Sequence, residues 1–262
     1  MVEERAPGGS MVEIDGRRLE YRVIGEGMGP KLVFLHEGLG SKDLWRDFPG
    51  DVVEVTGRPG LVYSREGHGW SDPVREPRTP RFMHYEALVV LPRLLERLEV
   101  SAPILIGHSD GASIAVIHAG AGRPVAGLVL LAPHVFVERE SIAAIESARA
   151  RFETTDLPQR MARYHRDPYS TFHAWNDIWL DPGFRDWNIE DSLSGITCPI
   201  LLIQGLDDEY GTLAQVDAIE RGLRGPVERL LLADCGHSPH LAQPAAVLAA
   251  TGRFVNRITG EA

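Results

Sequence analysis

The chain has 262 residues, of which 44% are hydrophobic and 24% charged, the balance of an ordinary water-soluble globular protein. Its formal net charge is −10 at pH 7, and a surface of this sign repels phosphate backbones, so we expect no nucleic-acid partner. Residues 1–10 lack the apolar stretch of a signal peptide, and the longest apolar runs are far short of the roughly 18 residues that a membrane span needs. These features predict a cytoplasmic protein without a membrane partner.

Short apolar segments alternate with helix-patterned segments along most of the chain. We predict strands at 11–15, 19–24, 31–35, 60–64, 103–106, 126–131, 199–204 and 227–233. We predict helices at 43–55, 81–98, 112–119, 213–223 and 240–256. The pair Asp15-Gly16 favours a tight hairpin turn between the first two strands. Short strands that alternate with helices are typical of a parallel sheet covered on both faces.

The region 135–195 breaks this alternation. It has no clear strand, and three of the five tryptophans of the chain lie between residues 175 and 187. We predict a helical cap here, with 1–134 and 196–262 forming the core. Trp175 and Trp179 are candidate substrate-binding residues in this cap, although most aromatic side chains in such a segment serve to pack it.

Residues 107–111 read Gly-His-Ser-Asp-Gly, a G-x-S-x-G pattern between a predicted strand and a predicted helix. This is the context of a nucleophile elbow, a turn so tight that only small neighbours fit. The turn lifts the hydroxyl of Ser109 above the sheet and leaves the backbone N–H of Asp110 free to point at a developing oxyanion. Ser109 is therefore the candidate nucleophile.

A serine hydroxyl needs a base, and the base needs a group that orients it. Asp207 and Asp208 follow the predicted strand 199–204, and His237 follows the strand 227–233. Because catalytic groups gather at the carboxyl ends of parallel strands, these residues and Ser109 should meet at one edge of the sheet. His237 is the candidate base, and on position alone either aspartate could orient it.

Five segments together resemble the α/β-hydrolase family, in the capped branch that includes esterases, C–C bond hydrolases and cofactor-free perhydrolases. They are residues 36–40, 63–71, 107–111, 205–208 and 236–240, and the resemblance covers about 11–258. It implies an α/β-hydrolase fold, with a mostly parallel eight-stranded sheet, helices on both faces and a helical cap inserted after the sixth strand. The family's Gly-x-x-Asp pattern selects Asp208 rather than Asp207, and its Gly-His pattern selects His237.

The resemblance also implies a second oxyanion donor, the amide of Gly38. Glu37 departs from the family, which usually has glycine there. A carboxylate beside a forming oxyanion would oppose catalysis unless its charge is neutralised. We therefore expect an ion pair between Glu37 and Arg65 that braces the loop. The alternative is that Glu37 faces the cleft and receives a cationic or hydroxyl group of the substrate. The stretch 63–71 is structural in the family.

Other histidines are weaker candidates than His237 for the role of the base. His240 falls at the start of the last predicted helix, and the side chain of His108 should point away from the cleft. His165 and His173, in the cap, could touch substrate. No metal-ligand spacing and no dinucleotide-binding pattern is visible, so we expect neither a metal nor a cofactor.

These observations predict a serine hydrolase that cleaves a small ester-like substrate through an acyl-enzyme. C–C bond hydrolysis or perhydrolysis on the same triad stays open, because ester, thioester and C–C hydrolases share the triad; Arg160, Arg163 and Arg166 could bind the carboxylates of an oxo-acid. A non-catalytic receptor is disfavoured because all three triad members occur in the expected order. The sequence does not distinguish a monomer from a homodimer.

Overall fold

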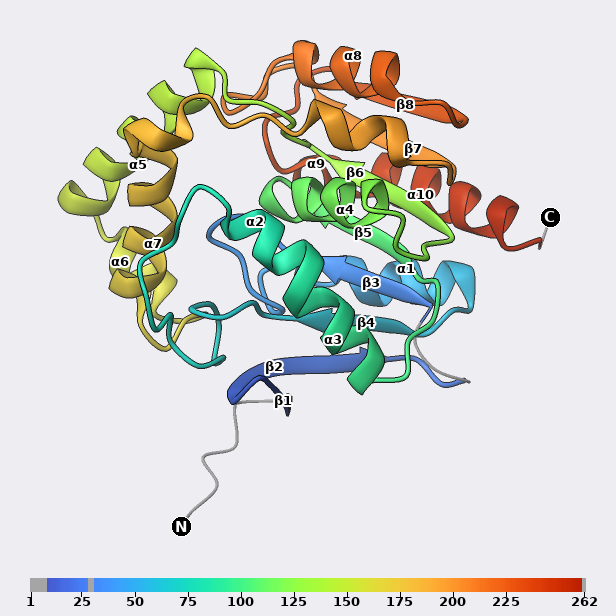
Figure 1. Cartoon of the computed structure of the whole chain (residues 1–262), viewed down its shortest axis with the longest axis horizontal. Coiled ribbons are helices and arrows are strands. Elements are labelled where there is room, and N and C mark those ends of the chain that lie inside the picture. The colour runs from blue at the N-terminus through green and yellow to red at the C-terminus, as the bar shows by residue number, and fades with distance from the viewer. Residues whose placement is uncertain (1–8, 28–30, 261–262) are drawn as a thin grey trace.

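A computed structural model describes residues 9–27 and 31–260, so the signal-peptide prediction falls almost wholly outside the described residues. Within them, eight strands form one sheet in the order β1-β2-β4-β3-β5-β6-β7-β8 (Figure 1). The strands are β1 (Ser10–Ile14), β2 (Arg17–Ile24), β3 (Leu32–Leu35), β4 (Gly60–Tyr63), β5 (Ile104–His108), β6 (Gly127–Leu131), β7 (Ile200–Gly205) and β8 (Val227–Leu232). Only the β1–β2 and β2–β4 pairings are antiparallel, which confirms the predicted mostly parallel sheet.

The first hairpin turns where the sequence predicts it. Asp15 and Gly16 both have positive φ, 54° and 73°, the backbone that a two-residue hairpin turn requires. Ile14 is paired with Arg17 across the turn. The local turn chemistry therefore sets the register of this edge of the sheet.

The helices of the core are α1 (Phe48–Thr56), α2 (Phe82–Tyr85), α3 (Leu91–Arg97), α4 (Asp110–Gly120), α8 (Leu213–Gly222), α9 (Pro239–Ala242) and α10 (Pro244–Ile258), with a π-helical turn at Glu86–Val90. Two predicted boundaries are wrong. Residues 43–47 form turns before α1. The predicted helix 240–256 is broken at Gln243, whose φ and ψ are −134° and 61°. Pro244, which has no N–H to donate, then begins α10.

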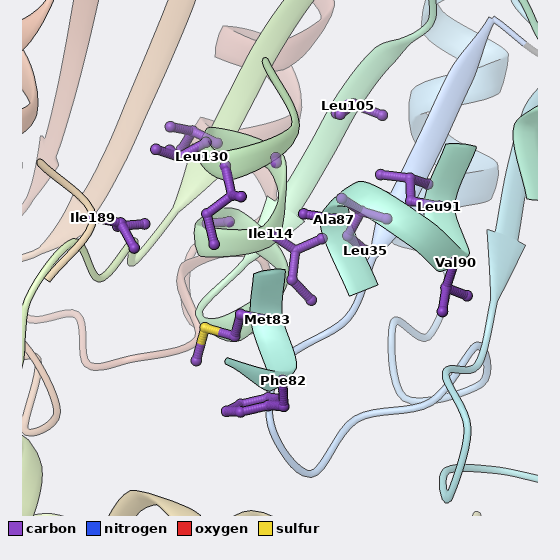
Figure 2. Packing of buried hydrophobic residues seen from close by; sticks show 14 of the residues in the cluster. Leu35, Phe82, Met83, Ala87, Val90, Leu91, Leu105, Ile114, Leu130 and Ile189 are labelled. Atoms are coloured by element: carbon purple, nitrogen blue, oxygen red, sulfur yellow. The ribbon is translucent and has the colours of Figure 1, made fainter. Parts of the chain in front are cut away.

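Alternate residues of the buried strands point to opposite faces of the sheet and divide the core in two. Val33 and Leu35 belong to the cluster that packs against α2, α3 and α4. Figure 2 shows part of this cluster, with Ala87, Leu91 and Ile114 near Leu35. Leu32 and Phe34 belong to a second cluster under α1 and α10. Burial on both faces explains why these strands read as continuous apolar runs in the sequence.

Between β6 and β7 the chain forms α5 (Arg139–Thr154), α6 (Leu157–Met161), α7 (Pro168–Leu180) and two 3₁₀ helices, Pro182–Phe184 and Glu190–Gly195. α5, α6 and α7 lie together at one side of the molecule, at the left in Figure 1. The rings of Phe152 on α5 and Phe172 on α7 stack with centroids 3.9 Å apart. We interpret this helical region as the expected cap. In the described part of the chain, no helix combines the length and apolar character needed to cross a bilayer.

Trp45 provides a test of the second cluster. It is 2% exposed, and its ring lies 5.6 Å from that of Phe34 and 5.0 Å from that of His240. We expect Trp45→Ala to lower the free energy of unfolding by about 3–5 kcal/mol, because it leaves a large cavity. Val55→Ala, at a half-exposed position of α1, should cost less than about 1 kcal/mol. Urea unfolding of both variants measures the difference, and equal losses would contradict this packing.

Candidate active site

Ser109 occupies a strained turn between β5 and α4. Its φ is 53° and its ψ is −118°, and α4 starts at the next residue. A Cβ at Gly111 would overlap the carbonyl of Leu35, and one at Gly107 would come 2.5 Å from the carbonyl oxygen of Gly111. Only glycine fits at either position, so the chain can make this turn, and the turn presents Ser109 to a pocket beside the sheet.

His237 and Asp208 complete a hydrogen-bonded line from Ser109. Nε2 of His237 lies 2.9 Å from the hydroxyl oxygen of Ser109, and Nδ1 lies 2.9 Å from both carboxylate oxygens of Asp208. Asp207 is exposed, and both carboxylate oxygens that contact Nδ1 of His237 belong to Asp208. The structure therefore brings together the three residues that the sequence selected, with Asp208 as the partner of His237.

Three donors besides His237 hold the carboxylate of Asp208. Its Oδ1 accepts from the amides of Tyr210 (2.8 Å) and Gly211 (3.3 Å), and its Oδ2 accepts from Nε2 of Gln204 (2.8 Å). Burial alone would raise the pKa of Asp208, but the hydrogen bond and charge of His237 and the Tyr210 amide outweigh it, so the pKa is lowered. An ionised Asp208 fixes the proton of His237 on Nδ1, which leaves Nε2 free to accept the proton of Ser109.

The two expected oxyanion donors face the same pocket. Gly38 and Asp110 both line it beside Ser109. Among the described hydrogen bonds, none is donated by the amide of either residue. A Cβ at Gly38 would overlap the indole nitrogen of Trp175, so this position of the loop also requires glycine.

The carbonyls of the loop that contains Gly38 are held from behind by three side chains, which we call the loop clamp: Arg65, His68 and His165. Arg65 donates to the carbonyls of His36 and Glu37, the second at 2.9 Å. Nε2 of His68 lies 3.0 Å from the carbonyl of Gly38.

His165 completes the clamp from the cap. Its Nδ1 accepts from the amide of Gly69, so its Nε2 carries the proton that is donated to the carbonyl of Leu39, 3.0 Å away. Burial lowers the pKa of His165 to about 4, which keeps the ring neutral and this tautomer in place at neutral pH. Four consecutive carbonyls, from His36 to Leu39, are thus bound by the clamp.

This arrangement aims the Gly38 amide. In a trans peptide unit the C=O of one residue and the N–H of the next point in opposite directions. The carbonyl of Glu37 accepts from Arg65, from Nδ1 of His36 (2.7 Å) and from the amide of Gly40 (3.1 Å). Because Arg65, His36 and Gly40 lie outside the pocket lining, this carbonyl faces away from the pocket, and we expect the N–H of Gly38 to point toward it.

The prediction of an ion pair between Glu37 and Arg65 is wrong, because the groups that accept hydrogen bonds from Arg65 are not the carboxylate of Glu37. Arg65 does brace the loop, but through backbone carbonyls, and the carboxylate of Glu37 lies 3.7 Å from Nδ1 of His108 instead. Burial raises the pKa of Glu37, but the interaction with His108 outweighs burial and lowers the pKa to about 2. Glu37 is therefore ionised at neutral pH, and its side chain, 30% exposed, lines the pocket.

The pocket has a volume of about 570 Å³ and lies between the sheet edge and the cap. Trp175 and Trp179, the expected substrate-binding residues, both line it. The indole of Trp179 also donates to the buried carboxylate of Asp110 at 3.2 Å, so this side chain joins α7 to the first turn of α4.

The comparisons with known proteins agree with this geometry. A model of the alpha/beta hydrolase family matches residues 32–251. The chain belongs to the α/β-hydrolase family. The sn-1-specific diacylglycerol lipase ABHD11 of Danio rerio is 32% identical over 114 residues, which are 43% of this chain and 34% of that protein, so the match spans about a third of the curated relative.

Two solved structures show how widely this hydrolase fold is shared. A thermophilic esterase from Thermogutta terrifontis superposes with a TM-score of 0.73 at 18% identity, covering 95% of this chain and 99% of that one. The esterase RhEst1 from Rhodococcus sp. ECU1013 gives 0.74 at 19% identity, with 95% and 98% covered. At such identities the likeness concerns the fold.

Sequence reasoning missed several residues of this hydrolase that line the pocket, notably His134, Glu209 and Tyr210. His134 lies three residues after the end of β6, so the argument from strand ends could have found it. Its ring centroid lies 5.6 Å from that of His237. The ring of Tyr210 lies 4.7 Å from that of His237.

The remaining histidines have packing roles. His108 is buried beneath the pocket, as expected, and its Nε2 donates to the carbonyl of His237 at 2.6 Å. His240 is buried against Trp45, and His173 is half-exposed beside Asp177. Across the residues that the structure describes, no group of three or more His, Cys, Asp or Glu side chains is arranged to hold a metal ion.

Replacing Asp208 tests the assignment of the carboxylate. We expect Asp208→Asn to lower kcat about 10³- to 10⁴-fold, because an amide no longer fixes the tautomer of His237. Asp207→Asn, at an exposed neighbour, should change kcat less than about twofold. Steady-state kinetics with folding checked by circular dichroism would decide, and the reverse order of damage would move the role to Asp207.

Replacing Arg65 tests the loop clamp. We expect Arg65→Met to lower kcat about 10- to 100-fold with a smaller change in KM, since the Gly38 amide acts on the transition state. The free energy of unfolding should fall by about 2–4 kcal/mol, because two buried carbonyls lose a donor. Arg97→Met, on the exposed face of α3, serves as the control. A loss of stability with unchanged kcat would show that the clamp does not aim the amide.

The contact between Glu37 and His108 should affect how the free energy of unfolding changes at acidic pH. The pKa of Glu37 in the folded protein, about 2, lies below the ordinary value of 4.5. The stabilisation that this difference gives to the folded state is therefore present above about pH 4.5 and is lost as the pH falls toward 2. Between about pH 5 and pH 3, the unfolding free energy of Glu37→Gln should therefore fall less than that of the wild type, by about 1 kcal/mol. Urea unfolding at each pH measures it, and parallel pH profiles would contradict the contact.

Proposed function

We propose that this α/β-hydrolase cleaves small carboxylic esters through a covalent acyl-Ser109 intermediate. The observation that carries the proposal is the continuous line of hydrogen bonds from Ser109 through His237 to Asp208, with Ser109 and His237 on the wall of a pocket of about 570 Å³. A cleft of this size suits a small substrate.

The acylation step follows from these positions. Nε2 of His237 takes the proton of Ser109 as its oxygen attacks the ester carbon, and Asp208 stabilises the imidazolium that forms. The negative charge that develops on the carbonyl oxygen is met by the amides of Gly38 and Asp110. The tetrahedral intermediate then collapses as His237 returns the proton to the leaving alcohol.

Deacylation uses the same groups in reverse. His237 removes a proton from a water molecule that attacks the acyl carbon, the two amides again receive the oxyanion, and Ser109 leaves with a proton from His237. The products are a carboxylic acid and an alcohol, so no oxidant, metal or cofactor enters the balance.

The bond type is supported by two further observations. The relative and the two solved structures described above are a diacylglycerol lipase and two esterases, which act on ester bonds. The basic cap residues considered for an oxo-acid substrate do not line the pocket: Arg160 is paired with Asp156, and Arg166 donates to the carbonyl of Trp70. C–C bond hydrolysis of an oxo-acid is therefore the weaker candidate.

Covalent labelling and kinetics test the proposal together. A fluorophosphonate should label the wild type once, at Ser109, and Ser109→Ala should lose both the label and at least about 10³-fold in kcat on p-nitrophenyl esters of short acyl chains. Ser101→Ala, at an exposed serine outside the pocket lining, is the matched control. Labelling at another residue, or full activity in Ser109→Ala, would refute the acyl-enzyme.

A further inference from the structure

The pocket carries an uneven set of charges. Three acidic residues line it, Glu37, Asp110 and Glu209; the carboxylate of Asp110 is buried and accepts from Trp179, whereas Glu209 is exposed. Within the described part of the chain, no residue lining this pocket is lysine or arginine. The guanidinium of Arg151 reaches the hydroxyl of Tyr210, 3.4 Å away, from outside the lining. An anionic substrate would therefore meet two like charges and no cation on the wall.

The groups between these carboxylates are aromatic. Trp175, Trp179 and Tyr210 line the same pocket, and Trp175 stands against Gly38, the residue next to Glu37. Faces of tryptophan and tyrosine rings attract cations, and ammonium groups in particular, most strongly where water is excluded. A carboxylate beside aromatic walls thus offers a cation both charge and a weakly hydrated surface.

His134 adds an uncharged polar side chain to this pocket. It is 2% exposed, it lines the pocket, and its Nδ1 has no hydrogen-bond partner among the described residues. Burial lowers the pKa of His134 to about 3, so the ring is uncharged at neutral pH and does not offset the two glutamates.

We propose that the pocket selects esters that carry a positively charged ammonium group, attracted by Glu37 and Glu209 and contacted by the aromatic wall. The inference rests on the proposed esterase function and adds the substrate class. The proposal also explains why Glu37 stands at a loop position that is usually glycine. Its carboxylate would attract the ammonium group of the substrate. The carboxylate does not oppose the oxyanion when the bound substrate itself supplies a compensating cation.

Matched ester pairs test this selection. Choline butyrate and 3,3-dimethylbutyl butyrate have the same shape and differ in a quaternary nitrogen in place of a carbon. A second pair, with 4-trimethylammonio-butanoyl and 5,5-dimethylhexanoyl groups, moves the charge to the acyl side. In at least one pair we expect kcat/KM to be about tenfold or more higher for the cation, with a ratio that falls as salt rises.

Charge-removing variants locate the source of the preference. Glu37→Gln and Glu209→Gln should each lower the cationic-to-neutral ratio about threefold or more, chiefly through KM for the cation. Glu209 is exposed, so its variant tests the idea even if Glu37→Gln folds poorly. Glu153→Gln, on the exposed face of α5 and outside the pocket lining, removes the same charge and should leave the ratio unchanged.

Calorimetric titration separates the two proposals from each other. Choline binding that exceeds that of 3,3-dimethylbutan-1-ol, without hydrolysis of any ester, would keep the cation site and overturn the esterase function. Hydrolysis with ratios of one or below in both pairs, or with ratios unchanged in both glutamate variants, would overturn the charge selection alone. Absence of both binding and hydrolysis in the folded protein would overturn both.

Discussion

The carbonyl oxygen of Glu37 is the atom on which the candidate site depends. It accepts hydrogen bonds from Arg65, His36 and Gly40, and this fixes the peptide unit whose other end is the Gly38 N–H. A preorganised donor costs nothing to align when the oxyanion forms, whereas a mobile loop would have to be ordered at that moment. Through Arg65 and His68, the stretch 63–71 thereby holds the loop that carries this proposed oxyanion donor.

The cap is joined to the same parts of the core that would do the chemistry. His165 connects the cap to the oxyanion loop at Leu39 and to the amide of Gly69, and Trp179 connects α7 to the first residue of α4. These contacts are made by buried groups, whose hydrogen bonds are costly to break. Motion of α7 relative to the sheet would therefore disturb the side chain of Asp110, one of the two residues that we propose as oxyanion donors.

Features that depend on a few neighbouring residues could be predicted from the sequence, whereas contacts between distant segments could not. The elbow at 107–111 and the hairpin at Asp15-Gly16 were predictable, because backbone sterics confine such turns to few residue types. The position of Asp208 also followed from a fixed spacing. The partner of Arg65 did not, because its acceptors are backbone carbonyls, which every residue possesses and no pattern marks. The same holds for His165 and His134, whose partners are set by how the cap and strand ends pack.

The two variable positions of the elbow show why a side chain next to a nucleophile is seldom free. His108 donates from Nε2 to the carbonyl of His237, so it fastens the loop of the candidate base to β5. Its Nδ1 faces the ionised Glu37, which joins that loop in turn to the oxyanion loop. On the other side of Ser109, Asp110 accepts from Trp179 and so holds the cap. His108 and Asp110 therefore connect the nucleophile turn to three segments that are far apart in the chain: the loop of His237, the loop of Glu37 and the cap at Trp179. The strain at Ser109 can persist because these contacts over-determine the turn.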